Sequence, residues 1–163
     1  MNTQRSEIEE CIKTLKIDRN RFFEVSKQSY SQIIAAIQNE FVDKSFNWNK
    51  EIHWANMGHF KPGLACIAKA IQNWSWVNKL PLILPSTALP VYVLFEDTLN
   101  LQPKYWLYQA CPAELVLILN ECALWGDFYI VSKKFDWLIS LNHHDILYCV
   151  GTGLNTEAIN NLD

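Results

Sequence analysis

The spacing of apolar residues changes along this chain, and that change constrains the fold more than any other feature. In the C-terminal part, three short runs rich in aromatic and β-branched residues occupy 128–132, 137–141 and 146–150. Only the short polar segments 133–136 and 142–145 separate one run from the next. Runs of this length and composition favour β-strands, and connections this short suit hairpins. The three runs therefore predict an antiparallel meander.

Two further strands and one helix are indicated just before this meander. The segments 91–96 and 105–109 are again rich in aromatic and β-branched residues, which favours strands. Pro112 suits the first turn of a helix, where its missing N–H costs nothing. This helix carries an apolar stripe that ends before Gly126 and comprises Leu115, Ile118, Leu119 and Cys122.

The N-terminal part is predicted to be largely helical. Ser6 followed by Glu9 forms a capping-box pattern for a short first helix. Asp18 or Asn20 is placed to begin a longer helix. Its apolar residues recur at helical spacing: Phe23, Tyr30, Ile34, Ile37 and Phe41.

Prolines and glycines divide the segment that follows. Within 46–57, tryptophan and isoleucine alternate with polar neighbours, which indicates a short strand or an extended arm. Pro62 and Gly63 then precede a third predicted helix, whose apolar residues are Leu64, Ile67, Ala68, Ile71 and Trp74. Prolines between 81 and 90 are expected to end this helix and to form an extended connector.

Together these elements place the chain in the α+β class. We expect an antiparallel sheet of about five strands, mostly in the C-terminal half, with the helices packed on one face. The length of 163 residues predicts a single globular domain, 1–163. Its helical part covers about 1–80 and its sheet-rich part about 90–151. An apolar share of 50% and an aromatic share of 13% supply a continuous core.

Cysteine usage and the character of the N-terminus predict a cytoplasmic protein. Five cysteines, an odd number without a C-x-x-C pair, do not form the disulfide framework of a small secreted protein. We expect reduced thiols, with Cys122 buried on its helical stripe. The segment 1–10 is too polar for a signal peptide, and prolines interrupt the most apolar stretch, 80–95, so no contact with a membrane is expected.

Charge is distributed unevenly between the two halves. The formal net charge of −3 divides into +3 for 1–80 and −6 for 81–163. An electronegative side would steer a basic partner towards it and would disfavour nucleic acid. The alternative is that the acidic residues only solvate the surface, in which case Glu96 and Asp97 form a solvated strand end.

The segment Asn142-His143-His144-Asp145 is the densest polar group in the chain. Adjacent histidines on a strand point to opposite faces, which disfavours one shared metal ion. Asn and Asp at hairpin ends cap their own backbone, so a turn explains the segment without a ligand. We therefore expect no metal, no cofactor and no catalytic residue. The alternative is a small hydrolase or metal-dependent enzyme centred on His143, His144, Asp145 and Cys149.

Three segments of the chain resemble small bacterial proteins of unassigned function. They are PVYVLFED at 90–97, YWLYQACPAELVLILNEC at 105–122 and WGDFYIVSKKFDWLISLNHHD at 125–145. This likeness covers the C-terminal half. In size, α+β pattern, aromatic richness and acidity, the chain is also similar to toxin-immunity proteins, including the SUKH superfamily and the immunity partners of contact-dependent growth inhibition systems. The second resemblance implies a protein that binds one toxin domain and blocks it without a cofactor.

The leading hypothesis is therefore a non-catalytic immunity protein for a cognate, basic toxin domain such as a nuclease. Five acidic residues beside predicted strand ends or turns are the candidate contacts: Glu96, Asp97, Asp127, Asp136 and Asp145. Three aromatic neighbours would form the desolvated centre of the interface: Tyr105, Trp106 and Tyr129. Association is then expected to weaken with salt, and reversing Glu96 and Asp97 to lysine is expected to slow it without unfolding the protein.

Overall fold

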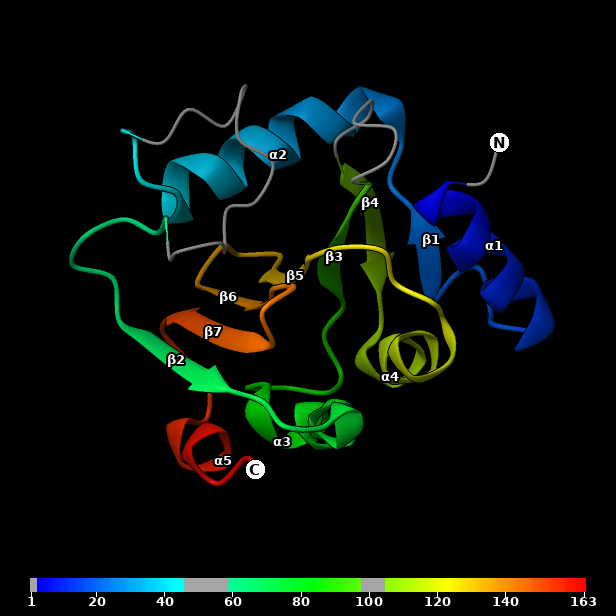
Figure 1. The fold of residues 1–163 in the computed structure, drawn as a ribbon. Coiled ribbons are helices and arrows are strands. Elements are labelled where there is room, and N and C mark those ends of the chain that lie inside the picture. The colour runs from blue at the N-terminus through cyan, green and yellow to red at the C-terminus, as the bar shows by residue number, and fades with distance from the viewer. Residues whose placement is uncertain (1–2, 46–58, 98–104) are drawn as a thin grey trace.

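The computed structural model describes residues 3–45, 59–97 and 105–163, whose strands form one antiparallel sheet (Figure 1). Seven strands lie in the order β1-β4-β3-β5-β6-β7-β2 in the part of the chain that is described. They are β1 (Phe22–Glu24), β2 (Cys66–Ala70), β3 (Val91–Glu96), β4 (Tyr105–Ala110), β5 (Phe128–Ser132), β6 (Trp137–Leu141) and β7 (Ile146–Gly151). The α+β class is confirmed, and the sheet has two more strands than predicted because β1 and β2 come from the N-terminal half.

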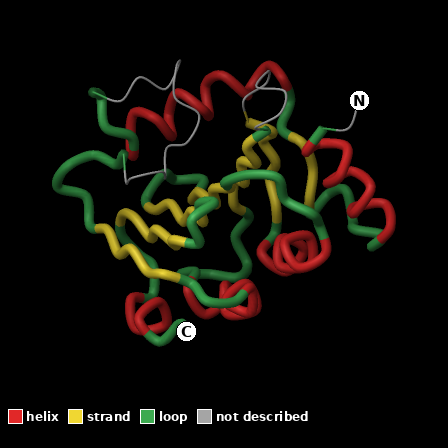
Figure 2. Tube along the Cα trace, viewed as in Figure 1, coloured by secondary structure: helices red, strands yellow, loops and turns green. Residues whose placement is uncertain are grey.

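The helices cover both faces of this sheet (Figure 2). On one face lie α1 (Gln4–Thr14), α3 (Leu80–Ile83), α4 (Pro112–Glu121), α5 (Thr156–Asn160) and the 3₁₀ helix η2 (Trp74–Lys79). On the other face lies α2 (Lys27–Phe41), which buries Ile34, Ile37 and Phe41 against the sheet. The predicted packing on one face thus holds for every described helix except α2. No described helix is long and apolar enough to cross a membrane.

The predicted C-terminal half is confirmed in detail. The strands β3, β4, β5, β6 and β7 occupy the predicted segments, and α4 begins at Pro112 as expected. Cys122 caps the C-terminus of α4 and is buried. All five cysteines are free. Local pattern and tertiary structure agree here because these strands pair with neighbours in short hairpins or across one helix.

The predicted N-terminal helices are partly wrong. The first helix begins one turn earlier than expected, because Thr3 is its N-cap and Ser6 supplies the reciprocal bond of the capping box. The second helix begins at Lys27 and not at Asp18 or Asn20. Before it, Phe22–Glu24 forms β1, which pairs with β4. This pairing buries Phe22 completely, and its ring packs against that of Tyr108 with 5.2 Å between the centroids. Tertiary pairing here overrides the helical period.

The predicted helix at 64–74 is also wrong. Residues Cys66–Ala70 form β2, which pairs along its whole length with β7. The apolar spacing in this segment fits a strand as well as a helix, and the ladder to β7 decides between them. The expected connector at 81–90 contains α3, with Pro81 in its first turn, where a proline is tolerated. The strand expected within 46–57 lies outside the described residues.

Candidate functional site

Three carboxylates meet at one end of the sheet. Glu96 ends β3, Asp97 follows it, and Asp127 directly precedes β5. Since β3 and β5 are antiparallel neighbours, their ends coincide, and the N–H of Glu96 donates to the carbonyl of Asp127 at 3.0 Å. The three residues are only 2%, 1% and 1% exposed. A carboxylate this deeply buried is costly unless hydrogen bonds or a cation compensate its charge.

Glu96 is compensated on the α2 face of the sheet. The hydroxyl of Tyr129, which is fully buried, donates to Glu96 Oε1 at 2.7 Å. Tyr105 packs edge-on against Tyr129, with ring centroids 5.9 Å apart, and its own carbonyl accepts from the hydroxyl of Tyr30 at 2.9 Å. Burial raises the pKa of Tyr129 and of Tyr105 well above the usual value, and the charge of Glu96 raises both further. Tyr129 therefore remains a neutral hydrogen-bond donor to Glu96.

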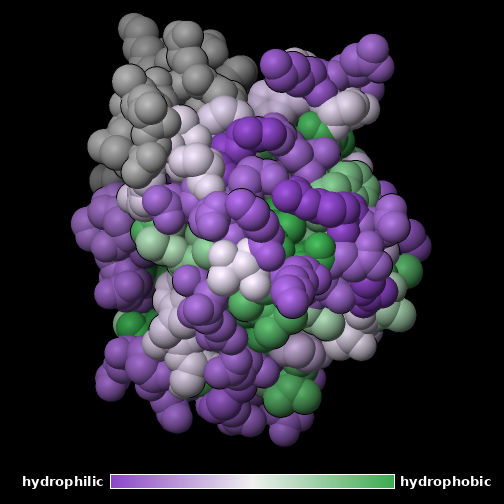
Figure 3. Space-filling view, turned by 90° about the vertical axis from the view of Figure 1, so that its right-hand side faces the viewer, coloured by the Kyte–Doolittle hydropathy of each residue, from purple (hydrophilic) through white to green (hydrophobic). Residues whose placement is uncertain are grey.

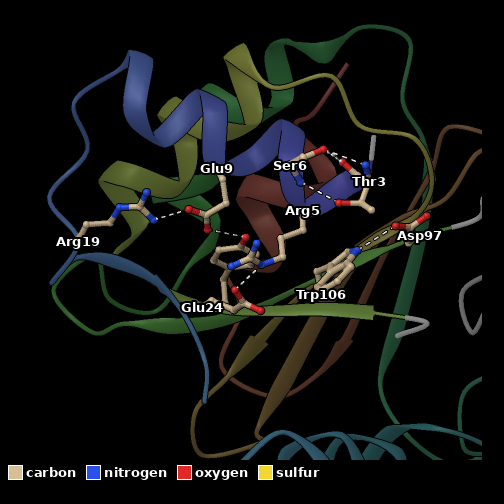
Figure 4. Close-up of polar contacts among 9 residues, drawn as sticks. Thr3, Arg5, Ser6, Glu9, Arg19, Glu24, Asp97 and Trp106 are labelled. Carbon is tan, nitrogen blue, oxygen red and sulfur yellow. Dashed lines mark hydrogen bonds and ion pairs between the residues drawn. The ribbon is translucent and has the colours of Figure 1, made fainter. Parts of the chain in front are cut away.

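Asp97 is compensated on the opposite face, next to the N-terminus of α1 (Figure 4). Its Oδ2 accepts from Trp106 Nε1 at 3.0 Å and from the N–H of Gln4 at 3.4 Å. The buried Gln4 side chain also bonds the backbone after α4, donating to the carbonyl of Ala123 at 3.0 Å and accepting from the N–H of Trp125 at 2.6 Å. A carboxylate at a helix N-terminus is stabilised by the helix dipole as well. Asp97 thus fixes both α1 and the Trp106 ring.

Asp127 is compensated by the turn between β6 and β7. Its Oδ1 accepts from the N–H of His143 at 2.8 Å and lies 3.0 Å from His143 Nδ1. The side chain of Asp127 is fully buried, whereas that of His143 is 41% exposed. Asn142 Oδ1 accepts from the N–H groups of His144 and Ile146, so the predicted self-capped turn is confirmed.

The four residues of the alternative enzyme centre are not assembled. Cys149 points into the core, where burial raises the pKa of its thiol to about 12. His144 and Asp145 are exposed on the turn, where the ring of His143 lies 4.0 Å from that of His144 between centroids, and the Nδ1 of His143 faces Asp127 and not Cys149. Within the described ranges, no group of three or more His, Cys, Asp or Glu residues is arranged to hold a metal ion.

The structure brings together most of the predicted contact residues, but not as an acidic surface. Six of them gather at this end of the sheet, in or beside β3, β4 and β5: Glu96, Asp97, Tyr105, Trp106, Asp127 and Tyr129. Asp145 lies in the β6–β7 turn at the same end, while Asp136 lies in the β5–β6 turn at the other end, and both are exposed. The expectation of a solvated strand end at Glu96 and Asp97 is wrong. Since both are buried, lysine at either position would disrupt the fold.

An open groove, which sequence analysis did not find, adjoins this end of the sheet. Its volume is about 270 Å³, and it lies between β1, β4 and the start of α2. It is lined by Glu24, Val25, Lys27, Tyr30, Tyr105, Trp106 and Leu107, and it continues towards Arg5 and Ser26. We call these nine residues the Trp106 groove. Apart from the two aromatic residues of β4, no local pattern marked its lining, since the residues come from three separate stretches of the chain, at 5, 24–30 and 105–107.

A polar network holds α1 against the rim of the Trp106 groove (Figure 4). Arg5 Nε is 2.6 Å from Glu24 Oε2, and Arg19 Nη1 is 2.7 Å from Glu9 Oε2. The hydroxyl of Tyr108 donates to Glu9 Oε1 at 3.0 Å. The outer surface on this side is predominantly hydrophilic, with apolar residues in separate patches (Figure 3).

Comparison with known proteins identifies a family for the chain. The model of DUF6756, a family of unknown function, matches residues 1–162. The chain belongs to this family. Searches among curated proteins and among solved structures found no match. The resemblance to proteins of unassigned function is confirmed, and membership in DUF6756 extends it beyond the C-terminal half to the N-terminal half as well.

Proposed function

We propose that this protein is a non-catalytic binding protein, and specifically a bacterial immunity protein that binds one cognate toxin domain and blocks it. The observation that carries the proposal is the Trp106 groove. Aromatic and apolar walls inside a charged rim are typical of the centre of a protein–protein interface. The toxin domain would insert an apolar side chain beside Tyr30 and Trp106, and would require no cofactor.

The aromatic walls are fixed before any partner arrives. Trp106 is held through its Nε1 by the buried carboxylate of Asp97, and Tyr30 is held through its hydroxyl by the carbonyl of Tyr105. A side chain that is already immobilised loses little conformational entropy on binding. This favours Tyr30 and Trp106 as anchors, whereas Tyr105 and Tyr129 are buried and would only support them.

The burial of three carboxylates changes the expected electrostatics. Of the five acidic candidates, only Asp136 and Asp145 are exposed, and the Trp106 groove carries Arg5 and Lys27 on its rim. A basic toxin domain would therefore be steered by less negative charge than the net −6 of residues 81–163 implies. We expect association to weaken only modestly as the salt concentration rises.

Coexpression with the product of the upstream gene tests this function. We expect a stoichiometric complex in the cytoplasm and rescue of growth when that product is toxic. Trp106→Ala should weaken the complex because it removes a wall, whereas the rim variant Lys27→Glu should speed association, because it replaces a positive charge facing a basic toxin domain with a negative one. Leu117→Ala, which truncates a residue 50% exposed on α4, is the matched control and should bind normally. The proposal is refuted if the wild-type protein does not bind the product of the upstream gene and does not rescue growth.

One observation favours a second candidate function, a hydrolase. The buried Asp127 orients the partly exposed His143 through Nδ1, as an orienting carboxylate does for a general base. Such an enzyme would be centred on His143 and Asp127, without Cys149. Turnover of ester or amide substrates that His143→Gln abolishes, with the melting temperature unchanged, would favour this candidate over the immunity protein.

A further inference from the structure

In the part of the chain that is described, the outer edge of β2 is open along the whole strand. Among the described strands, β2 is the last of the sheet and pairs with β7 alone. At its ends, the N–H of Gly151 donates to the carbonyl of Ala65, and the N–H of Ile71 donates to the carbonyl of Asp145. Backbone groups alternate in direction along an antiparallel strand. The odd-numbered residues therefore bond to β7, and Cys66, Ala68 and Ala70 direct their N–H and C=O groups outward.

These outward groups have no partner among the described residues, and the side chains leave them accessible. Cys66, Ala68 and Ala70 are all exposed, and all three are small and uncharged. The one charged residue of the strand, Lys69, points towards α5, where its Nζ donates to the carbonyls of Ile159 and Asn160 at 3.2 and 2.6 Å. It therefore does not guard the edge, although exposed edges are commonly protected by lysine, proline or a bulge.

The opposite edge of the sheet shows what a protected edge looks like in this molecule. β1 has only three residues, and the N–H of Phe22 is taken by the carbonyl of Asp18. The remaining outward residue, Glu24, carries the ion pair with Arg5 beside it. A short, charged edge does not accept another strand readily, whereas the longer β2, whose outward-facing residues are uncharged, does.

We propose that β2 pairs with β2 of a second copy of this chain, which joins the two sheets into one continuous antiparallel sheet. The strand is self-complementary about a two-fold axis at Ala68. In this register Ala68 faces its counterpart, Cys66 faces Ala70, and Ile67 faces Lys69 of the other copy. Each outward-facing pair exchanges two backbone hydrogen bonds. No two like charges stand opposite one another, because Lys69 meets an aliphatic residue.

The size of this contact determines how strongly the two copies associate. A strand of five residues spans about 17 Å and buries well below the roughly 800 Å² per partner of a standard stable interface. α5 lies beneath β2 (Figure 1) and occupies the same face of the joined sheet in both copies, so its exposed polar residues form the rim. The dimer is therefore reversible and depends on protein concentration.

Sedimentation equilibrium on the full chain tests the association. The weight-average mass should rise with concentration from 19.0 kDa towards twice that value. Ala68→Pro should remain at the monomer mass with little change in melting temperature, because the N–H that it removes points away from β7. Ala68→Lys, which places two lysines opposite one another across the axis, should also be monomeric. A wild-type chain that stays monomeric, or variants that still dimerise, would overturn the proposal.

Crosslinking under a mild thiol oxidant tests the register. Ala68→Cys should give a disulfide-linked dimer, because facing residues of such a pair have Cα atoms about 5.5 Å apart. Ala70→Cys should also crosslink, to the native Cys66 of the other copy. The wild type should not, since its two Cys66 residues lie about 13 Å apart along the strands. Ala35→Cys, exposed on α2, controls for random collision. Equal crosslinking of Ala35→Cys and Ala68→Cys would contradict the register.

Discussion

Removing the hydroxyl of Tyr129 measures how much the buried Glu96 depends on its hydrogen bond. Tyr129→Phe keeps the ring and its packing, and deletes only the donor that lies 2.7 Å from Glu96 Oε1. Tyr129 is fully buried and Glu96 is 2% exposed, so water does not replace the lost donor without rearrangement. A hydrogen bond to a charged group contributes about 1.5–3 kcal/mol, and we expect a loss of this size in the free energy of unfolding.

The assay is urea denaturation followed by far-UV circular dichroism. For a chain of this length, the expected loss corresponds to a decrease of roughly 3–12 °C in melting temperature. Tyr92→Phe, on the same face of the adjacent strand β3 but only half-buried, is the matched control and should change the free energy of unfolding by less than about 0.5 kcal/mol.

A double-mutant cycle with Glu96→Gln isolates the pair. If the hydrogen bond is the cause, the two substitutions together should cost less than the sum of the single ones, because each already removes the same interaction. A loss below about 0.5 kcal/mol for Tyr129→Phe, or strictly additive effects, would refute the view that Tyr129 compensates the charge of Glu96.

Three further predictions concern the core, the thiols and pH. Trp137→Ala should cost about 3–5 kcal/mol in urea denaturation, because Trp137 is 5% exposed within the core, and a loss below about 1 kcal/mol would place this side chain outside it. A reductant should leave the melting temperature unchanged, since all five cysteines are free, and a decrease of several degrees would indicate a disulfide. Burial raises the pKa of Cys149 to about 12, above its usual value of about 8.5. The unfolded thiol therefore ionises first, and stability that is complete below about pH 8.5 should fall as the pH rises towards 12. Cys149→Ala should make this alkaline decrease shallower, and an unchanged slope would contradict the assignment.

The sequence alone determined the elements whose partners lie close in the chain. The meander of β5, β6 and β7 needs only short turns, and α4 is bounded by Pro112 and by the end of its own apolar stripe. In such segments the period of apolar residues, the turn residues and the packing agree, so local patterns suffice. The turn at Asn142 is of the same kind, because its hydrogen bonds are made to its own backbone.

Only the tertiary structure decided the elements that depend on distant partners. The sequence patterns of β1 and β2 predict parts of helices, and this prediction is wrong because a short apolar segment fits either period until β4 or β7 supplies a ladder. The Trp106 groove has the same origin, because Arg5, Lys27 and Tyr105 are separated in the chain and meet only in the fold.

The carboxylates show this division most clearly. Their types and their positions at strand ends were evident from the sequence, which predicted Glu96, Asp97 and Asp127 as contacts on an acidic surface. Whether they face water was not evident, because burial depends on the donors that surround a charge. Those donors, on Tyr129, Trp106 and His143, come from other strands and turns of the folded sheet. The sequence therefore determined which residues carry charge at this end of the sheet. Tertiary contacts decided that these residues are buried, because a carboxylate remains buried only where the fold supplies its hydrogen bonds.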